Sequence, residues 1–394
     1  MTAAAPSRLR VVAPVGFAQL VGYGGTYYLP AILAAPIGRD LGLAPSWTFA
    51  GLSAALVVSS FIGPAVGRFV DNGGARQALV AANIAFAAGL ALLGSAHGPL
   101  AMAAAWLIMG LGMGLGYYET AFAALTRLFG TSARNSISGV TLIAGFTSTV
   151  SWPLMAWLEA HFGWRGVCFF WVAANLLVAL PLNLTLPSPG PLPERSATPH
   201  GAEERASALS PAAERRAMIA VGLMFTATAI VSSGLSALMP RLLVQFGASQ
   251  TAAIAASALI GPAQVAGRLA EMGWLSRYNP LLSARLATLF LPIGAGAMLI
   301  GGPALAYPFT ALYGVGNGIL TIARGALPLA LFGPAGYGRR IGILSAPARI
   351  AAAIAPVALG LLFDALGAMG LIAMAALNLV GFAALFLAPA ARRT

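Results

Sequence analysis

The sequence predicts an all-α membrane protein with twelve transmembrane helices in two six-helix bundles and both termini in the cytoplasm. Composition, the spacing of apolar segments and the distribution of arginines predict this fold. The chain has 394 residues, of which 59% are hydrophobic and only 8% are charged. A soluble domain typically carries about 25% charged residues, so this is an integral membrane protein. At about 20 residues per span, its length accommodates about a dozen helices.

The apolar segments follow one another along the chain with short interruptions. The third and fourth are separated only by the turn at His97-Gly98-Pro99, and the ninth and tenth by Gly301-Gly302-Pro303. The first is too long for a signal peptide, so we expect a retained span. The expected spans are 11–36, 45–67, 77–96, 99–126, 136–158, 165–186, 217–239, 249–267, 281–301, 303–332, 341–363 and 368–389.

One long polar stretch divides these segments into two sets of six. Residues 187–216 are rich in proline, serine, glutamate and arginine. Such a composition buries too little apolar surface to fold independently. We therefore expect an N-terminal bundle at 1–186, a cytoplasmic linker at 187–216 and a C-terminal bundle at 217–394.

The arginines predict the orientation in the membrane. The formal net charge is +12, and all 22 basic residues are arginine. If the N-terminus is inside, 17 arginines fall on the cytoplasmic side and three, Arg39, Arg165 and Arg241, fall outside. This positive-inside bias predicts a multi-pass protein of a bacterial-type inner (plasma) membrane. Because the arginines lie in short loops, we expect no nucleic-acid partner.

The two halves contain an internal repeat. The segment Ile62–Arg68 resembles Ile260–Arg268, and the glycine motif Gly112–Gly116 resembles Gly314–Gly318. Parallel repeats in transporters place a substrate site near the membrane midplane between the halves. Further pairs at a similar offset are Phe129-Gly130 with Phe332-Gly333, and Gly139 and Pro153 with Gly342 and Pro356.

The loop after the second expected span carries the most specific motif. It reads Gly67-Arg-Phe-Val-Asp71-Asn-Gly-Gly74-Ala-Arg76. With the spans and the repeat, this loop resembles the major facilitator superfamily, whose pattern is Gly-x-x-x-Asp-(Arg/Lys)-x-Gly-(Arg/Lys)-(Arg/Lys). The resemblance covers essentially the whole chain. It implies that Gly67, Asp71, Gly74 and Arg76 help to hold a cytoplasmic gate shut.

Several positions depart from the family pattern. Asn72 and Ala75 replace basic residues, and the second-half copy is weaker, with Arg268 and Glu271 keeping its charge character. The fourth expected span lacks the arginine of many proton-coupled members. The fifth reads Ser-Trp152-Pro-Leu in place of the Gly-Pro motif of many drug/proton antiporters, which disfavours that subgroup.

Three charged residues interrupt the apolar segments: Glu119, Arg324 and Arg349. A charge in the bilayer core costs at least about 2.5 kcal/mol, so such residues face a protein cavity and serve a function. The resemblance implies that helices one, four, seven and ten line that cavity. We therefore expect Glu119 and Arg324 to meet across it, directly or through substrate.

These charges predict the chemistry of the substrate site. The guanidinium groups of Arg324 and Arg349 suit a carboxylate or oxyanion. Glu119 could compete with substrate for an arginine or carry a proton; a permanent ion pair or a gate-closing arginine remains the structural alternative. Tyr27 and Asn317 are further candidate substrate contacts, although tyrosines also pack between helices and buried amides also link them.

The sequence therefore predicts a secondary active transporter that moves a small, monocarboxylate-like organic anion by alternating access, with a proton or in exchange. The alternatives are a proton-coupled efflux pump for amphipathic or cationic compounds, and a non-transporting receptor or lipid-handling protein. No motif indicates an enzyme, cofactor, metal site or ATP site. We expect a monomer in a lipid bilayer, with an anionic substrate and a proton or counter-solute as partners.

Overall fold

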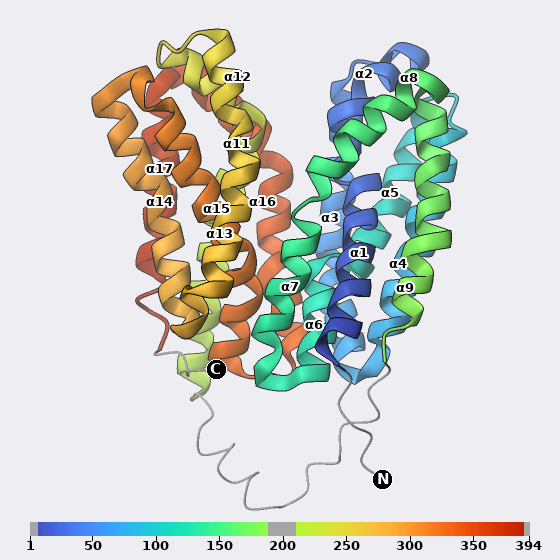
Figure 1. The fold of residues 1–394 in the computed structure, drawn as a ribbon, viewed down its shortest axis with the longest axis horizontal. Coiled ribbons are helices and arrows are strands. Elements are labelled where there is room, and N and C mark those ends of the chain that lie inside the picture. Colours follow the sequence, from blue (N-terminus) through green and yellow to red (C-terminus); the bar gives the residue numbers. More distant parts are fainter. Residues whose placement is uncertain (1–6, 188–209, 390–394) are drawn as a thin grey trace, which may run out of the picture. The chain divides into compact units, whose positions relative to one another are not determined.

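A computed structural model describes residues 7–187 and 210–389. The regular elements of these residues are all helices, without a strand. The described residues form two compact units, 7–187 with 336–346, and 210–335 with 347–389. Figure 1 shows that the helices of each unit run side by side as a bundle.

The predicted linker falls mostly outside the described residues. Its residues 188–209 are not described, while helix α11 already begins at Pro211. The capping hydroxyl of Ser210 accepts a hydrogen bond from the backbone N–H of Ala213. The helix therefore starts inside the range expected for the linker.

The first unit contains the helices of the N-terminal half and the start of α16. Those of the N-terminal half are α1 (Arg8–Gly25), α2 (Leu29–Leu41), α3 (Ser46–Phe69), η1 (Val70–Gly74), α4 (Ala75–Gly94), α5 (Pro99–Gly116), α6 (Tyr118–Phe129), η2 (Gly130–Ala133), α7 (Arg134–Ala144), α8 (Thr147–Ala174), η3 (Asn175–Ala179) and α9 (Leu180–Leu184).

The second unit contains the remaining helices and most of α16. They are α11 (Pro211–Gln245), α12 (Gln250–Ala258), α13 (Ile260–Gly273), η4 (Leu275–Arg277), α14 (Pro280–Gly301), η5 (Gly302–Leu305), α15 (Ala306–Phe332), α16 (Tyr337–Leu366), η6 (Gly367–Met369) and α17 (Gly370–Ala384). Residues 336–346, at the start of α16, belong to the first unit although they come late in the chain.

Several helical stretches are long and apolar enough to cross a membrane. The longest has 86 residues, about 130 Å if it were one straight helix, against a hydrocarbon core of about 30 Å. It must therefore fold back, and it contains a glycine, Gly163, with φ 66°. Among the described residues the six stretches are Ser46–Gly94, Pro99–Leu184, Pro211–Ser236, Gln250–Arg277, Pro280–Phe332 and Tyr337–Ala384.

These stretches confirm membrane-spanning helices in an all-helical fold, while the number twelve and the cytoplasmic termini stay predictions. Several expected spans are not single helices. The fifth, 136–158, is divided between α7 and α8, the sixth, 165–186, among α8, η3 and α9, and the eighth, 249–267, between α12 and α13. The first, 11–36, is divided between α1 and α2 by the turn at Thr26. The fourth, 99–126, is divided between α5 and α6 at Tyr117, whose ψ of −175° is extended.

The repeated glycines have a packing role in both units. A Cβ on Gly112 would lie 2.6 Å from the Phe86 ring, and one on Gly314 would lie 2.6 Å from the Cβ of Ala263. A Cβ on Gly318 would overlap the carbonyl oxygen of Gln264. The glycines let α5 and α15 approach neighbouring helices closely, as small residues do in membrane bundles.

This close packing predicts that Gly318→Ala destabilises the protein. Overpacking in a close contact typically costs about 1–3 kcal/mol, and here the neighbour is backbone, which moves less easily than a side chain. The matched control is Gly296→Ala in α14, where a Cβ would meet nothing within 4 Å. Thermal unfolding in detergent should show a lower Tm for Gly318→Ala only; equal Tm values would contradict the packing role.

Candidate substrate site and gating contacts

The breaks in the first and fourth expected spans are joined to each other in the first unit. Gln19 Nε2 donates to the carbonyl oxygen of Gly116 at 2.6 Å. The hydroxyl groups of Thr26 and Tyr117 form a hydrogen bond at 2.8 Å, and the Tyr23 ring stacks on Tyr117 with centroids 3.9 Å apart. These contacts fix an aromatic cluster where both helices are interrupted.

Glu119 lies next to this cluster, in the first turn of α6. It is half-buried, and the partial positive charge of a helix N-terminus favours a carboxylate at that position. Tyr27 is also half-buried and packs edge-on against Tyr23, with ring centroids 6.1 Å apart. The first unit therefore brings one carboxylate and several tyrosines to a single helix break.

Asp71 binds the start of α16. Its Oδ1 accepts from the backbone N–H of Gly338 at 2.7 Å, and its Oδ2 accepts from the backbone N–H of Arg339 at 2.8 Å. Both donors lie in the first turn of α16, where backbone N–H groups have no partner inside the helix. The carboxylate satisfies two of these donors and lies at the positive end of the helix dipole.

The same contact depends on glycines in both helices. A Cβ on Gly67 would overlap the carbonyl oxygen of Gly338, and one on Gly342 would lie 2.6 Å from the carbonyl oxygen of Gly63. The two helices therefore approach backbone to backbone along paired Gly-x-x-x-Gly segments. This packing explains why the start of α16 belongs to the first unit.

The rest of the predicted gating loop contributes in other ways. A Cβ on Gly74 would overlap the Phe69 ring, so Gly74 permits the tight turn between α3 and α4. Arg76 is half-buried, and its side chain makes no hydrogen bond within the described part of the chain. Arg127, from the end of α6, instead donates to the backbone carbonyl of Asp71.

In the second unit, Arg324 lies on α15 and contacts α11. Its Nη2 donates to the hydroxyl oxygen of Thr228 at 3.1 Å. Tyr313, Asn317 and Leu320 precede Arg324 at helical spacing, so these four side chains share one face of α15. Arg324 is half-buried.

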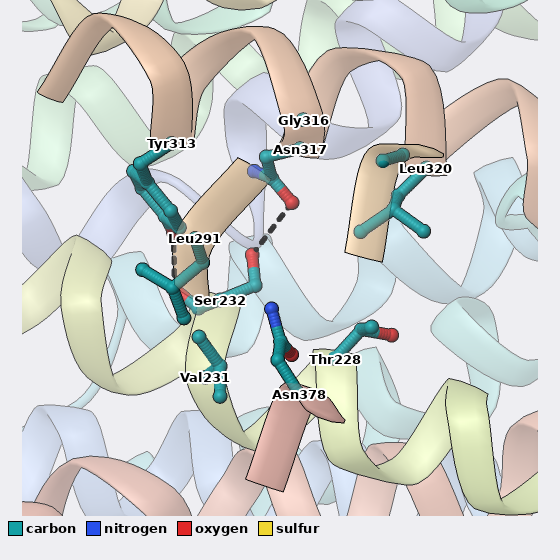
Figure 2. A pocket seen from close by; sticks show the side chains of 10 residues that line it. Thr228, Val231, Ser232, Leu291, Tyr313, Gly316, Asn317, Leu320 and Asn378 are labelled. Carbon is teal, nitrogen blue, oxygen red and sulfur yellow. Dashed lines mark hydrogen bonds between the residues drawn. The ribbon is translucent and has the colours of Figure 1, made fainter. Parts of the chain in front are cut away.

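A cavity lies beside this face of α15 (Figure 2). It is a small space that is partly open, and its volume of about 250 Å³ includes open solvent. Asn317 Oδ1 accepts from Ser232 Oγ at 3.1 Å, and the Tyr313 hydroxyl donates to the Ser232 carbonyl at 3.2 Å. Asn317 therefore makes the helix-to-helix hydrogen bond that the sequence left open. The lining residues are Thr228, Val231, Ser232, Ala287, Leu291, Tyr313, Gly316, Asn317, Leu320 and Asn378.

The other predicted residues of the second unit lie apart from this cavity lining. Arg349 is half-buried in α16, two residues after Pro347. Arg268 and Glu271 are buried near the end of α13, with 6% and 1% of their surface exposed. The expected meeting of Glu119 with Arg324 involves both units and stays a prediction.

Sequence reasoning missed four residues of these sites. Thr228 and Asn378 gave no signal because a single polar residue in an apolar span is common in helix packing. Arg127 and Tyr337 looked like ordinary loop residues. Tyr337 is nevertheless 1% exposed in the first unit, where the carboxylates of Glu119 and Asp71 interact with it electrostatically.

A family comparison settles the class of protein. The family model described as "Major Facilitator Superfamily" matches residues 15–323, which is most of the chain. The chain belongs to the major facilitator superfamily. Members of this superfamily are membrane transporters, so the predicted family and the general class of function are confirmed.

Solved structures of superfamily transporters share the fold. The human organic anion transporter TETRAN is 18% identical with a TM-score of 0.74, and the comparison covers 98% of this chain and 100% of that one. The E. coli fucose:proton symporter is 16% identical with a TM-score of 0.73 and the same coverage. The proton:xylose symporter is 14% identical with a TM-score of 0.71, covering 96% and 94%.

Two features of the described residues lie at positions that the sequence analysis singled out. The pairing of Asp71 with the first turn of α16 lies in the family's loop motif, and Arg324 lies in the helix that corresponds to the tenth span. The geometry thus provides a charged face on α15 and a helix-capping contact at the loop. Both are suited to a protein that binds a solute and changes conformation.

Proposed function

We propose that the chain is a secondary active transporter that moves a small organic anion of the monocarboxylate class across the inner membrane by alternating access. The observation that carries this proposal is Arg324, held on the polar face of α15 by Thr228. The hydrogen bond orients the guanidinium plane, and a planar fork of donors suits a carboxylate. Arg349 supplies a second positive charge from α16 in the same unit.

The remaining candidate residues have supporting roles in this proposal. Glu119 carries a proton or competes with substrate for an arginine, and Tyr27 and Asn317 contact the substrate. The coupling is to a proton or to a counter-solute in exchange. That an organic anion transporter shares the fold is consistent with this substrate class.

We propose that the loop motif controls the cytoplasmic gate. Asp71 and Gly67 hold the start of α16, and the cycle requires this contact to break and re-form. Gly74 and Arg76 shape the same loop, while Arg268 and Glu271 act at the repeated position of the second half. The contact is suited to such a switch because it includes charge-assisted hydrogen bonds from the first turn of α16 to one carboxylate.

The topology completes the proposal. Twelve spans, arranged as bundles at 1–186 and 217–394 around a cytoplasmic linker at 187–216, leave both termini inside. The excess of arginine on the side assigned to the cytoplasm supports this orientation. The protein acts as a monomer.

A thermal-shift screen of the purified protein tests the substrate class. The compounds are small carboxylates, inorganic oxyanions and organic cations at equal ionic strength. A ligand that binds only the folded protein raises Tm with its concentration, so carboxylates should stabilise it. Stabilisation by cations alone would overturn the anion proposal.

Replacing Glu119 with glutamine tests its role in coupling. Glu119→Gln keeps the size and hydrogen-bonding capacity of the side chain but cannot carry the proton. We expect uptake driven by a pH gradient to fall at least about tenfold, while exchange of labelled for unlabelled anion continues. If gradient-driven uptake is unchanged, Glu119 is not the coupling group; if exchange also stops, its role is in binding or folding.

A second candidate is efflux of amphipathic cations. The observation that favours it is the tyrosine cluster beside Glu119, because aromatic faces and a carboxylate attract cations. In that case Glu119→Gln abolishes cation efflux and Arg324→Ala leaves it intact. The anion proposal expects the Arg324 substitution to be the damaging one.

A further inference from the structure

The cavity of the second unit contains a buried amide without a partner. Asn378 comes from α17 and is 3% exposed. Its Oδ1 has no hydrogen-bond partner among the described residues, and Figure 2 shows the side chain below Ser232 with its amide nitrogen directed toward Ser232. An unsatisfied buried polar atom costs about 1–3 kcal/mol, so such groups are normally paired. The amide is therefore placed to bind something that enters the cavity.

The cavity offers the hydrogen bonds that a hydroxyl group needs. Asn317 uses its Oδ1 to accept from Ser232, while its Nδ2 makes no hydrogen bond within the described residues. Asn378 adds an amide with a free acceptor from a different helix. A hydroxyl both donates and accepts, and two amides present both functions.

The character of the lining excludes a charged occupant. None of the ten described residues that line the cavity is ionisable in the physiological range. Besides uncharged polar side chains, the lining consists of Val231, Leu291 and other apolar residues. An ion in this space would lose its hydration without a counter-charge, which is costly. A neutral polar group avoids that cost.

The cavity adjoins the anion site through one shared side chain. Thr228 lines the cavity, and its hydroxyl also accepts from Arg324 Nη2. Ser232 lies one turn further along α11, a rise of about 6 Å along the helix axis. A short carbon chain spans that distance between a carboxylate and a hydroxyl group.

We propose that this cavity is a hydroxyl-recognition subsite between Asn317 and Asn378, and that the transported anion is a hydroxylated carboxylate such as a hydroxy acid or sugar acid. Its carboxylate binds Arg324 and one of its hydroxyl groups enters the cavity. The inference rests on the proposed function, because it takes Arg324 as the anion site. It adds the substrate class and the residue Asn378 to that proposal.

The test compares hydroxylated acids with their deoxy analogues in proteoliposomes. The probes are labelled glycerate against propionate, and gluconate against hexanoate, with wild-type protein and Asn378→Leu. The wild type should prefer the hydroxylated member of a pair, and Asn378→Leu should reduce that preference, measured as the ratio of the two uptake rates, roughly tenfold to hundredfold. Asn378→Ser keeps a group that donates and accepts, so it should restore part of the preference. It replaces the leucine variant in the comparison if that variant does not fold.

The outcomes separate this inference from the proposed function. Anion uptake that depends on Arg324 but shows no preference for hydroxylated acids would overturn the subsite alone. Equal loss of both acids in Asn378→Leu and Asn378→Ser would also overturn it, because a structural water site gives that result. Failure to transport any of the four acids would overturn the subsite together with the anion proposal.

Discussion

Replacing Arg324 with glutamine is expected to reduce anion uptake at least about thirtyfold. Removing one partner of a desolvated charge pair typically costs about 2–5 kcal/mol, and 2 kcal/mol corresponds to about thirtyfold in affinity. Glutamine can still donate to Thr228 but has neither the charge nor the fork of the guanidinium. The measurement is initial uptake of a labelled carboxylate by proteoliposomes, over a range of substrate concentrations.

Two variants make this result specific. Arg241→Gln removes an exposed arginine of the same unit that forms an ion pair with Asp364, and it should leave uptake unchanged. Arg324→Lys keeps the charge without the fork and should retain part of the activity. Full uptake by Arg324→Gln would show that the anion binds elsewhere.

The second large effect is expected for Asp71→Asn. An asparagine keeps one acceptor oxygen but turns an NH₂ group toward a backbone N–H at the start of α16. Hydrogen bonds to a charged group contribute about 1.5–3 kcal/mol each, and the interaction with the helix dipole is lost as well. We expect transport to fall more than about tenfold, with a lower Tm in detergent.

The matched control for Asp71 is Asp364→Asn, which alters an exposed ion pair and should change neither quantity much. Asp71→Glu keeps the charge on a longer side chain and should recover part of the transport rate. If Asp71→Asn transports at the wild-type rate with an unchanged Tm, the contact with α16 has no role in the cycle.

Composition and span length were sufficient to predict an all-helical membrane protein, and the resemblance of the loop motif and the repeat indicated the superfamily. The helix breaks at Thr26 and Tyr117 were not predicted, although Gly25 and Gly116 directly precede them, because glycine is frequent throughout the apolar segments and most of these glycines do not end a helix. They are stabilised by contacts between distant segments, such as Gln19 with the carbonyl of Gly116. Local propensity carries no information about such tertiary partners.

The candidate site was also predictable only in part from the sequence. The charge pattern identified Arg324 and the loop motif identified Asp71, since a charged residue in an apolar segment is conspicuous. Their partners were not identifiable: Thr228 is an ordinary hydroxyl residue in a span, and Gly338 lies 267 residues from Asp71. Asn378 became a candidate only when its burial beside an open cavity was known.

Uptake by proteoliposomes that contain only this protein tests the central claim most directly. A labelled carboxylate is supplied outside, with an inward proton gradient or with unlabelled carboxylate inside, and wild type is compared with Arg324→Gln. We expect accumulation by the wild type under at least one of these conditions and almost none by the variant. The anion proposal would be contradicted if the protein accumulated organic cations but no carboxylate, and if the loss of Arg324 did not affect that accumulation.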